Sequence, residues 1–163
     1  MLIVRERKTF GSRWWLWGSL KSLQALSTIP TIQAVCVHSV CVAEAAMELC
    51  RTNHAFKKCH RNEVLAAALL HEYCKVGKYR DKGNGEYEYF DAGLVGHGEG
   101  SVIMAQQYIK LTAREIVAIR WHMGAYSGSQ DWDTLSAVYD RYPEAMCLHF
   151  ADMIATHYDE VPF

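Results

Sequence analysis

Histidine and carboxylate residues recur through the chain at intervals of roughly 25 to 33 positions, and this spacing constrains the possible folds more than any other feature. The residues concerned are His38, the adjacent pair His71 and Glu72, His97, His122 and Asp152. Each lies on, or at the start of, a segment with a helical pattern. Helices that pack side by side can bring such distant positions to one point in the core of a bundle. Imidazole and carboxylate groups together can bind one or two transition-metal ions, so we expect a metal-dependent enzyme.

Composition limits the class of protein and its partners. The 163 residues are half apolar and 21% charged, which is typical of one soluble globular domain. The formal net charge of -1 gives no general reason to expect a nucleic-acid polymer or an anionic membrane as a partner. An anionic small-molecule substrate would have to be attracted by a local cluster of charge.

Six cysteines are present, and most lie within apolar helical runs: Cys36, Cys41, Cys50, Cys59, Cys74 and Cys147. No pair has the two-residue gap of a zinc knuckle. We interpret them as buried free thiols rather than disulfides, which favours a reducing setting and a cytoplasmic location.

The first 30 residues form a segment whose role the sequence leaves open. Basic residues precede Trp14, Trp15 and Trp17, but the apolar stretch is far shorter than the roughly 20 residues needed to cross a bilayer. We therefore expect no membrane span, and we divide the chain into an N-terminal segment, 1–30, and a helical domain, 31–163.

Apolar periodicity and capping signals predict five helices, over about 31–53, 62–75, 99–110, 112–122 and 143–159. Thr112 and Glu115 have the spacing of a capping box. The second helix is apolar almost all round and is expected to be central and buried. Residues 79–90 alternate aromatic and polar side chains around two glycines, which predicts a hairpin or ordered loop. The expected fold is an all-α bundle of five or six helices with this one small insertion.

The motifs around the recurring residues resemble those of the HD-domain superfamily of metal-dependent phosphohydrolases. The resemblance covers about residues 35–160. The matching motifs are His38-Ser39, the stretch from Ala67 through His71-Glu72 to Lys75, and the stretch Leu148–Asp152. The surroundings of His97 and His122 are similar to those of the binuclear subset of this superfamily. The resemblance implies an HD-domain helical bundle.

Residue by residue, the resemblance implies a ligand set for two divalent transition-metal ions, with Mn, Fe, Co and Ni as the expected elements. His38, His71, Glu72 and Asp152 would hold the first ion. Glu72, His97 and His122 would hold the second, with Glu72 bridging. The implied activity is hydrolysis of a phosphate monoester or diester, nucleotides included, through a metal-activated water, with Lys75 and Glu72 as catalytic residues.

The chain departs from the family pattern at one position, because the family's His-Asp doublet is His-Glu here. The longer Glu72 side chain is compatible with a working two-metal site, with one weakly bound metal, or with a domain that binds a ligand without turning it over. A further alternative is a diiron oxygenase of the same superfamily, since its ligands are of the same kind.

Several other residues have plain structural interpretations. We expect His54, His60, His149 and His157 to be structural or surface residues, with His149 packed beside the site, and Glu99 to be a first-turn acid. Arg120 could reach a substrate phosphate or form a surface salt bridge. The Tyr79, Tyr87 and Tyr89 side chains could form a base-stacking lid or one face of a packed hairpin. Nothing in the sequence marks Cys74 as a nucleophile.

Overall fold

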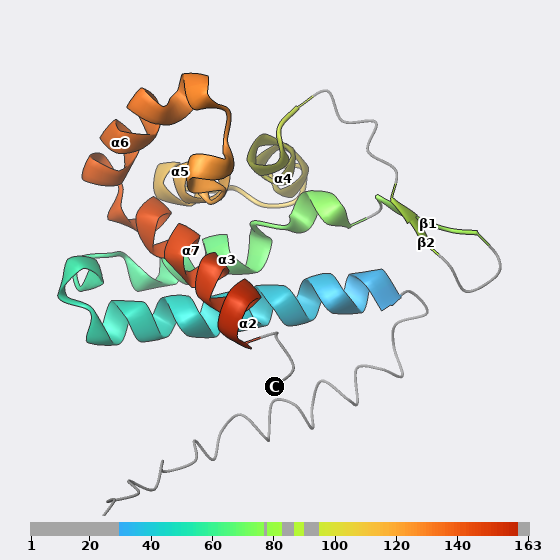
Figure 1. Cartoon of the computed structure of the whole chain (residues 1–163), viewed down its shortest axis with the longest axis horizontal. Helices are drawn as coiled ribbons and strands as arrows, with labels where there is room; N and C mark the ends of the chain where they lie inside the picture. Colours follow the sequence, from blue (N-terminus) through green and yellow to red (C-terminus); the bar gives the residue numbers. More distant parts are fainter. Residues whose placement is uncertain (1–29, 77, 83–86, 90–94, 160–163) are drawn as a thin grey trace, which may run out of the picture.

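The longest helix, α2 (Pro30–Thr52), packs mainly against two others, and the remaining helices are arranged around those two. The computed structural model describes residues 30–76, 78–82, 87–89 and 95–159. In Figure 1, α3 (Arg61–Leu70) and α7 (Pro143–Ile154) lie against α2, and α5 (Ala113–Trp121) lies beyond them. The shorter α4 (His97–Ala105) packs on α5, and α6 (Trp132–Arg141) leads into α7. These helices confirm the expected all-α bundle.

Alanines occupy many of the crossing points between helices. Seven alanines of the described chain are fully buried: Ala46, Ala67, Ala68, Ala118, Ala145, Ala151 and Ala155. The separation of two packed helices depends on the side chains at their contact, so small residues let these backbones approach closely. Val42, Val64, Ile119 and Leu148 fill the spaces between them. The core therefore extends over α2, α3, α5 and α7, the elements that carry or precede most of the recurring residues.

Two predictions about the second helix are wrong. The α-helix ends at Leu70 rather than Lys75, and a separate 3-10 turn, η2 (Tyr73–Lys75), follows it. The helix is also not buried all round, because Leu65 and Leu69 are 37% and 46% exposed. Its apolar run is continuous, but among the described residues it is the face carrying Val64, Ala67 and Ala68 that is buried.

The third predicted helix, expected over about 99–110, is also misplaced at both ends. The helix expected from Glu99 begins two residues earlier, so His97 is its first residue, and it ends at Ala105. The capping box is confirmed: Thr112 Oγ1 accepts from the Glu115 amide, and the Glu115 carboxylate accepts from the Thr112 amide. Helix α6 was not among the predicted ranges. It follows two short 3-10 turns, η3 (Gly124–Tyr126) and η4 (Ser129–Asp131), which occupy the expected surface loop.

The predicted hairpin is present as two short antiparallel strands, β1 (Tyr79–Asp81) and β2 (Tyr87–Tyr89). Tyr79 pairs with Tyr89, and the hairpin projects from the bundle beyond η2 (Figure 1). The glycines expected at its turn lie outside the described residues, as do the tryptophans of the N-terminal segment. The side chains of its three tyrosines are also outside the description, so the choice between a lid and a packed face stays open.

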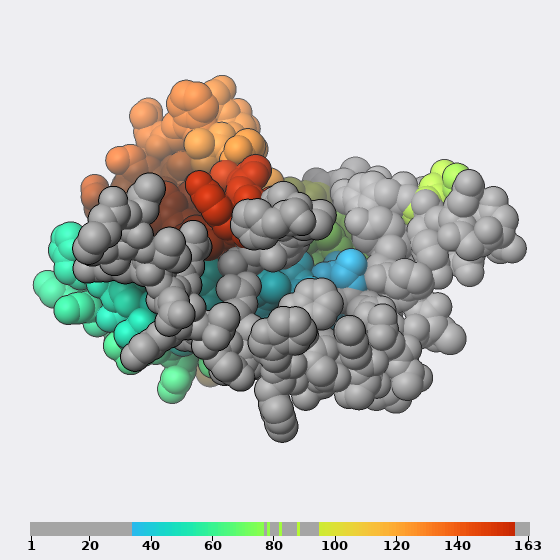
Figure 2. All heavy atoms as spheres, turned by 60° about the horizontal axis from the view of Figure 1, so that its bottom comes forward, coloured from blue at the N-terminus to red at the C-terminus, as the bar shows by residue number. Residues whose placement is uncertain are grey.

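The C-terminal helix continues as a π-helical segment, η5 (Ala155–Asp159), in agreement with the expected end near Asp159. Figure 2 shows α6 (orange) projecting on one side, with the end of the α7 segment (red) beside it. Among the described residues, no helix combines the length and apolarity that crossing a membrane requires.

Helix α4 meets α5 so closely that Gly98 cannot carry a side chain. A Cβ there would lie 2.8 Å from the Ile119 carbonyl oxygen and closer still to that of Arg120. Both contacts are with backbone, which cannot swing away. Gly98 therefore sets the distance between the helix that begins with His97 and the helix that ends before His122.

Gly98→Ala should lower the free energy of unfolding by about 1–3 kcal/mol, because the added methyl must push two helices apart. Urea denaturation of the metal-free protein measures this change. Gly100→Ala is the matched control on the same helix: its Cβ would lie 3.3 Å from the Cys74 Cβ, a much milder contact than those at Gly98. Alanine there also gains up to about 1 kcal/mol of helix propensity. Equal stability of the two variants would contradict the close approach of α4 and α5.

Candidate metal centre

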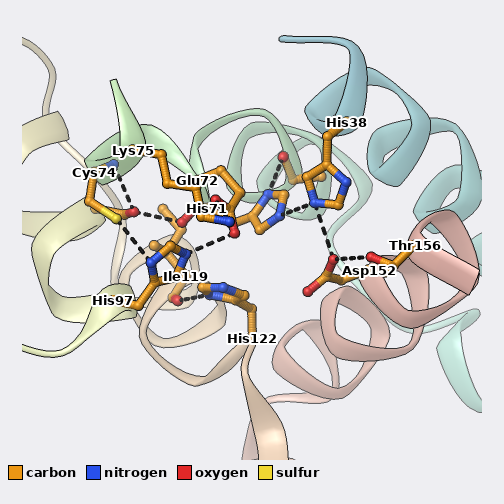
Figure 3. A network of polar contacts seen from close by, with 12 residues as sticks. His38, His71, Glu72, Cys74, Lys75, His97, Ile119, His122, Asp152 and Thr156 are labelled. Carbon is orange, nitrogen blue, oxygen red and sulfur yellow. Dashed lines mark hydrogen bonds and ion pairs between the residues drawn. The ribbon is translucent and has the colours of Figure 1, made fainter. Parts of the chain in front are cut away.

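His71 and His122 occupy equivalent positions, each directly after the last residue of a helix. Both rings bond back to the carbonyl three residues earlier, His71 Nδ1 to Ala68 O at 2.7 Å and His122 Nδ1 to Ile119 O at 2.6 Å. A carbonyl can only accept, so Nδ1 carries the hydrogen and Nε2 keeps its lone pair. The two helix ends thus present two Nε2 acceptors to the same space, with ring centroids 4.9 Å apart (Figure 3).

His38 and Asp152 enter this space from α2 and α7. His38 Nε2 lies 3.2 Å from His71 Nε2 and 3.2 Å from Asp152 Oδ1. Asp152 also accepts from the Thr156 hydroxyl at 3.4 Å. The ligand atoms of His71, His122 and Asp152 all lie within 4.8 Å of one another, as do those of His38, His71 and Glu72.

Glu72 lies at the centre of the second half of the cluster. Its Oε1 is 2.8 Å from His97 Nε2, and its Oε2 is 2.6 Å from the Lys75 ammonium. The ligand atoms of Glu72, His97 and His122 again lie within 4.8 Å of one another. Glu72 is therefore common to two of the groups, one with His38 and His71 and one with His97 and His122. The structure thus brings together the six expected metal ligands and Lys75.

Burial keeps two of the imidazoles neutral. Removal from water lowers the pKa of His122 to about 3 and lowers the pKa of His71 as well. Each therefore offers a lone pair at neutral pH. His122 Nε2 is fully buried and makes no hydrogen bond with any residue that the structure describes. A buried acceptor without a partner is costly, and a cation at this point would remove that cost.

His97 and the carboxylates are charged when no cation is bound. Burial alone would lower the pKa of His97, but its bonds with Cys74 and Glu72 outweigh burial and raise it to about 9. Burial would raise the pKa of Glu72, yet the bonds with His97 and Lys75 hold it well below its usual range. The pKa of Asp152 is likewise lowered, because the His38 bond and the nearby imidazoles outweigh burial. Ionised carboxylates and neutral imidazoles are the donors that divalent transition metals prefer, so the residues present fit such an ion.

Two residues beside the cluster were not recognised as part of it. Cys74 Sγ lies 3.2 Å from His97 Nδ1, on the side of the ring opposite Glu72. Ser101 Oγ accepts from the Cys74 amide at 3.1 Å and donates to the His71 carbonyl at 2.6 Å, which ties α4 to the turn after α3. Partners of metal-ligating histidines commonly fix ring orientation in this way. Cys74 is one residue from Lys75 in sequence, but a signal for Ser101 exists only in three dimensions.

The remaining candidates lie outside the cluster. Arg120 forms an ion pair with Glu99, lies 3.7 Å from Asp131 and stacks on the Trp121 ring, which supports the salt-bridge alternative. His149 Nδ1 lies 2.7 Å from the His122 carbonyl oxygen, so it packs beside the site as expected. His54, His60 and His157 are exposed.

Comparison with known proteins agrees with this geometry. The family model described as HD domain matches residues 35–157, three quarters of the chain. No curated protein and no solved structure matches the chain. The HD domain family consists mostly of metal-dependent hydrolases, and its members bind divalent metals. With a model match over most of its length and clusters of histidine and glutamate that could hold a metal, this chain belongs to the HD domain family.

Proposed function

We propose that the protein is a metal-dependent phosphohydrolase that acts on a phosphate monoester or diester, nucleotides included, and that residues 31–163 form the domain responsible. One observation carries the proposal: side chains from α2, the turn after α3, α4, the end of α5 and α7 converge in overlapping groups of metal ligands, beside a lysine ammonium (Figure 3). The partner is then a small molecule rather than a nucleic-acid polymer.

In the proposed arrangement, His38, His71, Glu72 and Asp152 hold one divalent ion, and Glu72, His97 and His122 hold a second. The mutual proximity of the ligand atoms supports this division. His122 belongs to a group with His71 and Asp152 as well as to one with Glu72 and His97, so it lies near both positions. When bound, such ions lower the pKa of a water molecule and neutralise charge that develops on a phosphoryl group.

The chain's own residues contribute orientation and charge. The Nδ1 bonds of His71 and His122 fix both rings, so their Nε2 atoms need no rearrangement on binding. Glu72 is buried, while the Lys75 side chain is 35% exposed. Lys75 can therefore exchange its carboxylate partner for a phosphate oxygen that arrives from solvent, and its ammonium would offset the added negative charge.

The longer side chain of Glu72 is compatible with a working site. Glu72 follows the end of α3 in a turn, and from there its two oxygens already reach His97 and Lys75. An aspartate at the same backbone position would fall short of these partners by about one carbon–carbon bond, and errors of about 1 Å are costly in catalysis. This favours glutamate as the residue to which the surrounding ligands are matched.

Reconstitution tests the activity directly. The metal-stripped protein loaded with Mn²⁺, Fe²⁺, Co²⁺ or Ni²⁺ should hydrolyse p-nitrophenyl phosphate, its bis ester or a nucleotide. His71→Ala should lower kcat/KM by at least about 100-fold, because it removes a ligand and its oriented lone pair. His54→Ala, at an exposed position, is the control. No turnover with any metal would refute the proposal, and oxygen consumption by an iron-loaded protein would favour the diiron oxygenase.

Lys75→Met should lower kcat/KM for phosphate esters by about 10- to 1,000-fold, while metal content stays within about twofold of the wild-type value. The physical reason is that the substitution removes a charge opposite the phosphoryl group without removing a ligand. Metal analysis by mass spectrometry and steady-state kinetics provide the two measurements. Lys57→Met removes an exposed lysine that belongs to none of the ligand groups and should leave both unchanged. A parallel fall in metal content would show that Lys75 acts on Glu72 alone.

Glu72→Asp should reduce occupancy of the second ion and lower kcat by about 10- to 100-fold, since the shortened carboxylate withdraws from His97. Glu72→Gln keeps the length of the side chain but removes its charge. Comparing the two variants separates the effect of side-chain length on occupancy and kcat from the effect of charge. A gain of activity in the aspartate variant would instead identify the natural residue as an impairment, and the protein as a ligand-binding domain.

A further inference from the structure

Three cysteines from separate segments bring their sulfur atoms together inside the bundle, away from the histidine cluster. Cys50 lies in the last turn of α2, Cys59 in the turn between η1 (His54–Phe56) and α3, and Cys147 on α7. Their Sγ atoms all lie within 4.8 Å of one another, and those of Cys50 and Cys147 are 3.7 Å apart. All three residues are buried and none forms a disulfide.

These distances suit a shared metal ion. Thiolates bind zinc at about 2.3 Å in tetrahedral geometry, which places two sulfurs of one site about 3.8 Å apart. Cys50 and Cys147 already have this separation. Cys59 would need to shift by no more than about 1 Å, and it lies in a turn rather than within a helix, where such an adjustment is easiest.

A buried carboxylate, Glu144, lies on the same helix as Cys147. Glu144 is one helical turn before Cys147 and is 2% exposed. Its Oε1 accepts from the amide of His60, the residue after Cys59, at 3.0 Å. Its Oε2 is buried and makes no hydrogen bond with any residue in the described part of the chain. Glu144 is grouped with His60 and Glu63 rather than with the three sulfurs. Its Oε1 also lies 3.7 Å from Arg114 Nε, so it is not counted among the ligands of the cysteine cluster.

The two clusters would select different ions. Cys50 is twelve residues beyond His38 on α2, about 18 Å along the helix axis. The histidine cluster offers nitrogen and oxygen donors, whereas this one offers three sulfurs, and soft thiolates favour zinc and other thiophilic ions over manganese. Cys147 Sγ also lies 3.8 Å from the Ala46 carbonyl, a long contact that a protonated thiol could make in place of metal binding.

We propose that Cys50, Cys59 and Cys147 form a structural site for one thiophilic d10 metal ion, zinc being the common one. The ion would join the end of α2, the turn into α3 and helix α7. These are the elements that carry His38, precede His71 and carry Asp152. The site would therefore hold the scaffold of the histidine cluster without contributing to its chemistry, and it does not depend on the phosphohydrolase proposal.

Cobalt substitution tests this site, since only thiolate ligands give Co²⁺ an intense sulfur-to-metal charge-transfer absorption. The full-length, reduced, metal-stripped protein is first loaded with Mn²⁺ and then titrated with Co²⁺. The expected result is a thiolate band that saturates at one equivalent and is abolished by one equivalent of Zn²⁺. Cys147→Ser should lose the band and the zinc-induced rise in Tm.

Two controls separate this cluster from other thiols. Cys74→Ser changes a buried cysteine beside His97, and Cys36→Ser changes an exposed one; both should keep the band and the zinc response. If Cys147→Ser does not fold, Cys59→Ser at the turn should lose the band instead. Absence of a thiolate band in the wild type, its loss in Cys74→Ser alone, or a Cys50–Cys147 disulfide in anaerobically purified protein would each overturn the proposal.

Discussion

The candidate site depends on a pair of buried helix ends that hold two uncharged imidazoles next to each other, edge to face. His71 and His122 each donate the Nδ1 hydrogen to a carbonyl in the last turn of their own helix, which leaves Nε2 directed inward. Both rings are fully buried, so protonation is unfavourable, and His122 Nε2 makes no hydrogen bond with a described residue. A bundle core normally avoids such groups. Here the arrangement is locally unfavourable in the absence of a cation, and it leaves lone pairs in place for one.

Charge is distributed unevenly around these rings. Asp152 faces His38 on one side, while Glu72, between His97 and Lys75, provides the negative charge on the other. In the metal-free state His97 and Lys75 supply two positive charges beside Glu72, which suggests that a bound cation replaces the proton on His97 rather than adding to it. The elements that impose these positions are the alanine-rich crossings of the helices and the close approach at Gly98.

The proposed cysteine site would also collect metal ligands from several helices, at the other end of α2. One end of the helix pair α2–α3 brings together nitrogen and oxygen donors, and the other brings together sulfur donors. Buried thiols tolerate an apolar setting far better than buried imidazoles or carboxylates do, because they are weakly polar and uncharged when protonated. The two clusters therefore differ in how strongly the metal-free state is disfavoured.

The sequence by itself determined the all-α class, the capping box at Thr112, the hairpin near Tyr79 and the set of residues that meet at the histidine cluster, because helical periodicity and ligand chemistry are local properties of the chain. It misjudged the end of α3 and its burial, since a continuous apolar run does not reveal which face meets a neighbour. Only the tertiary structure decided that Cys74 and Ser101 lie against His97 and His71, and that Cys50, Cys59 and Cys147 converge. Those contacts join segments up to 97 residues apart, and their positions follow from how helices pack rather than from any spacing along the chain.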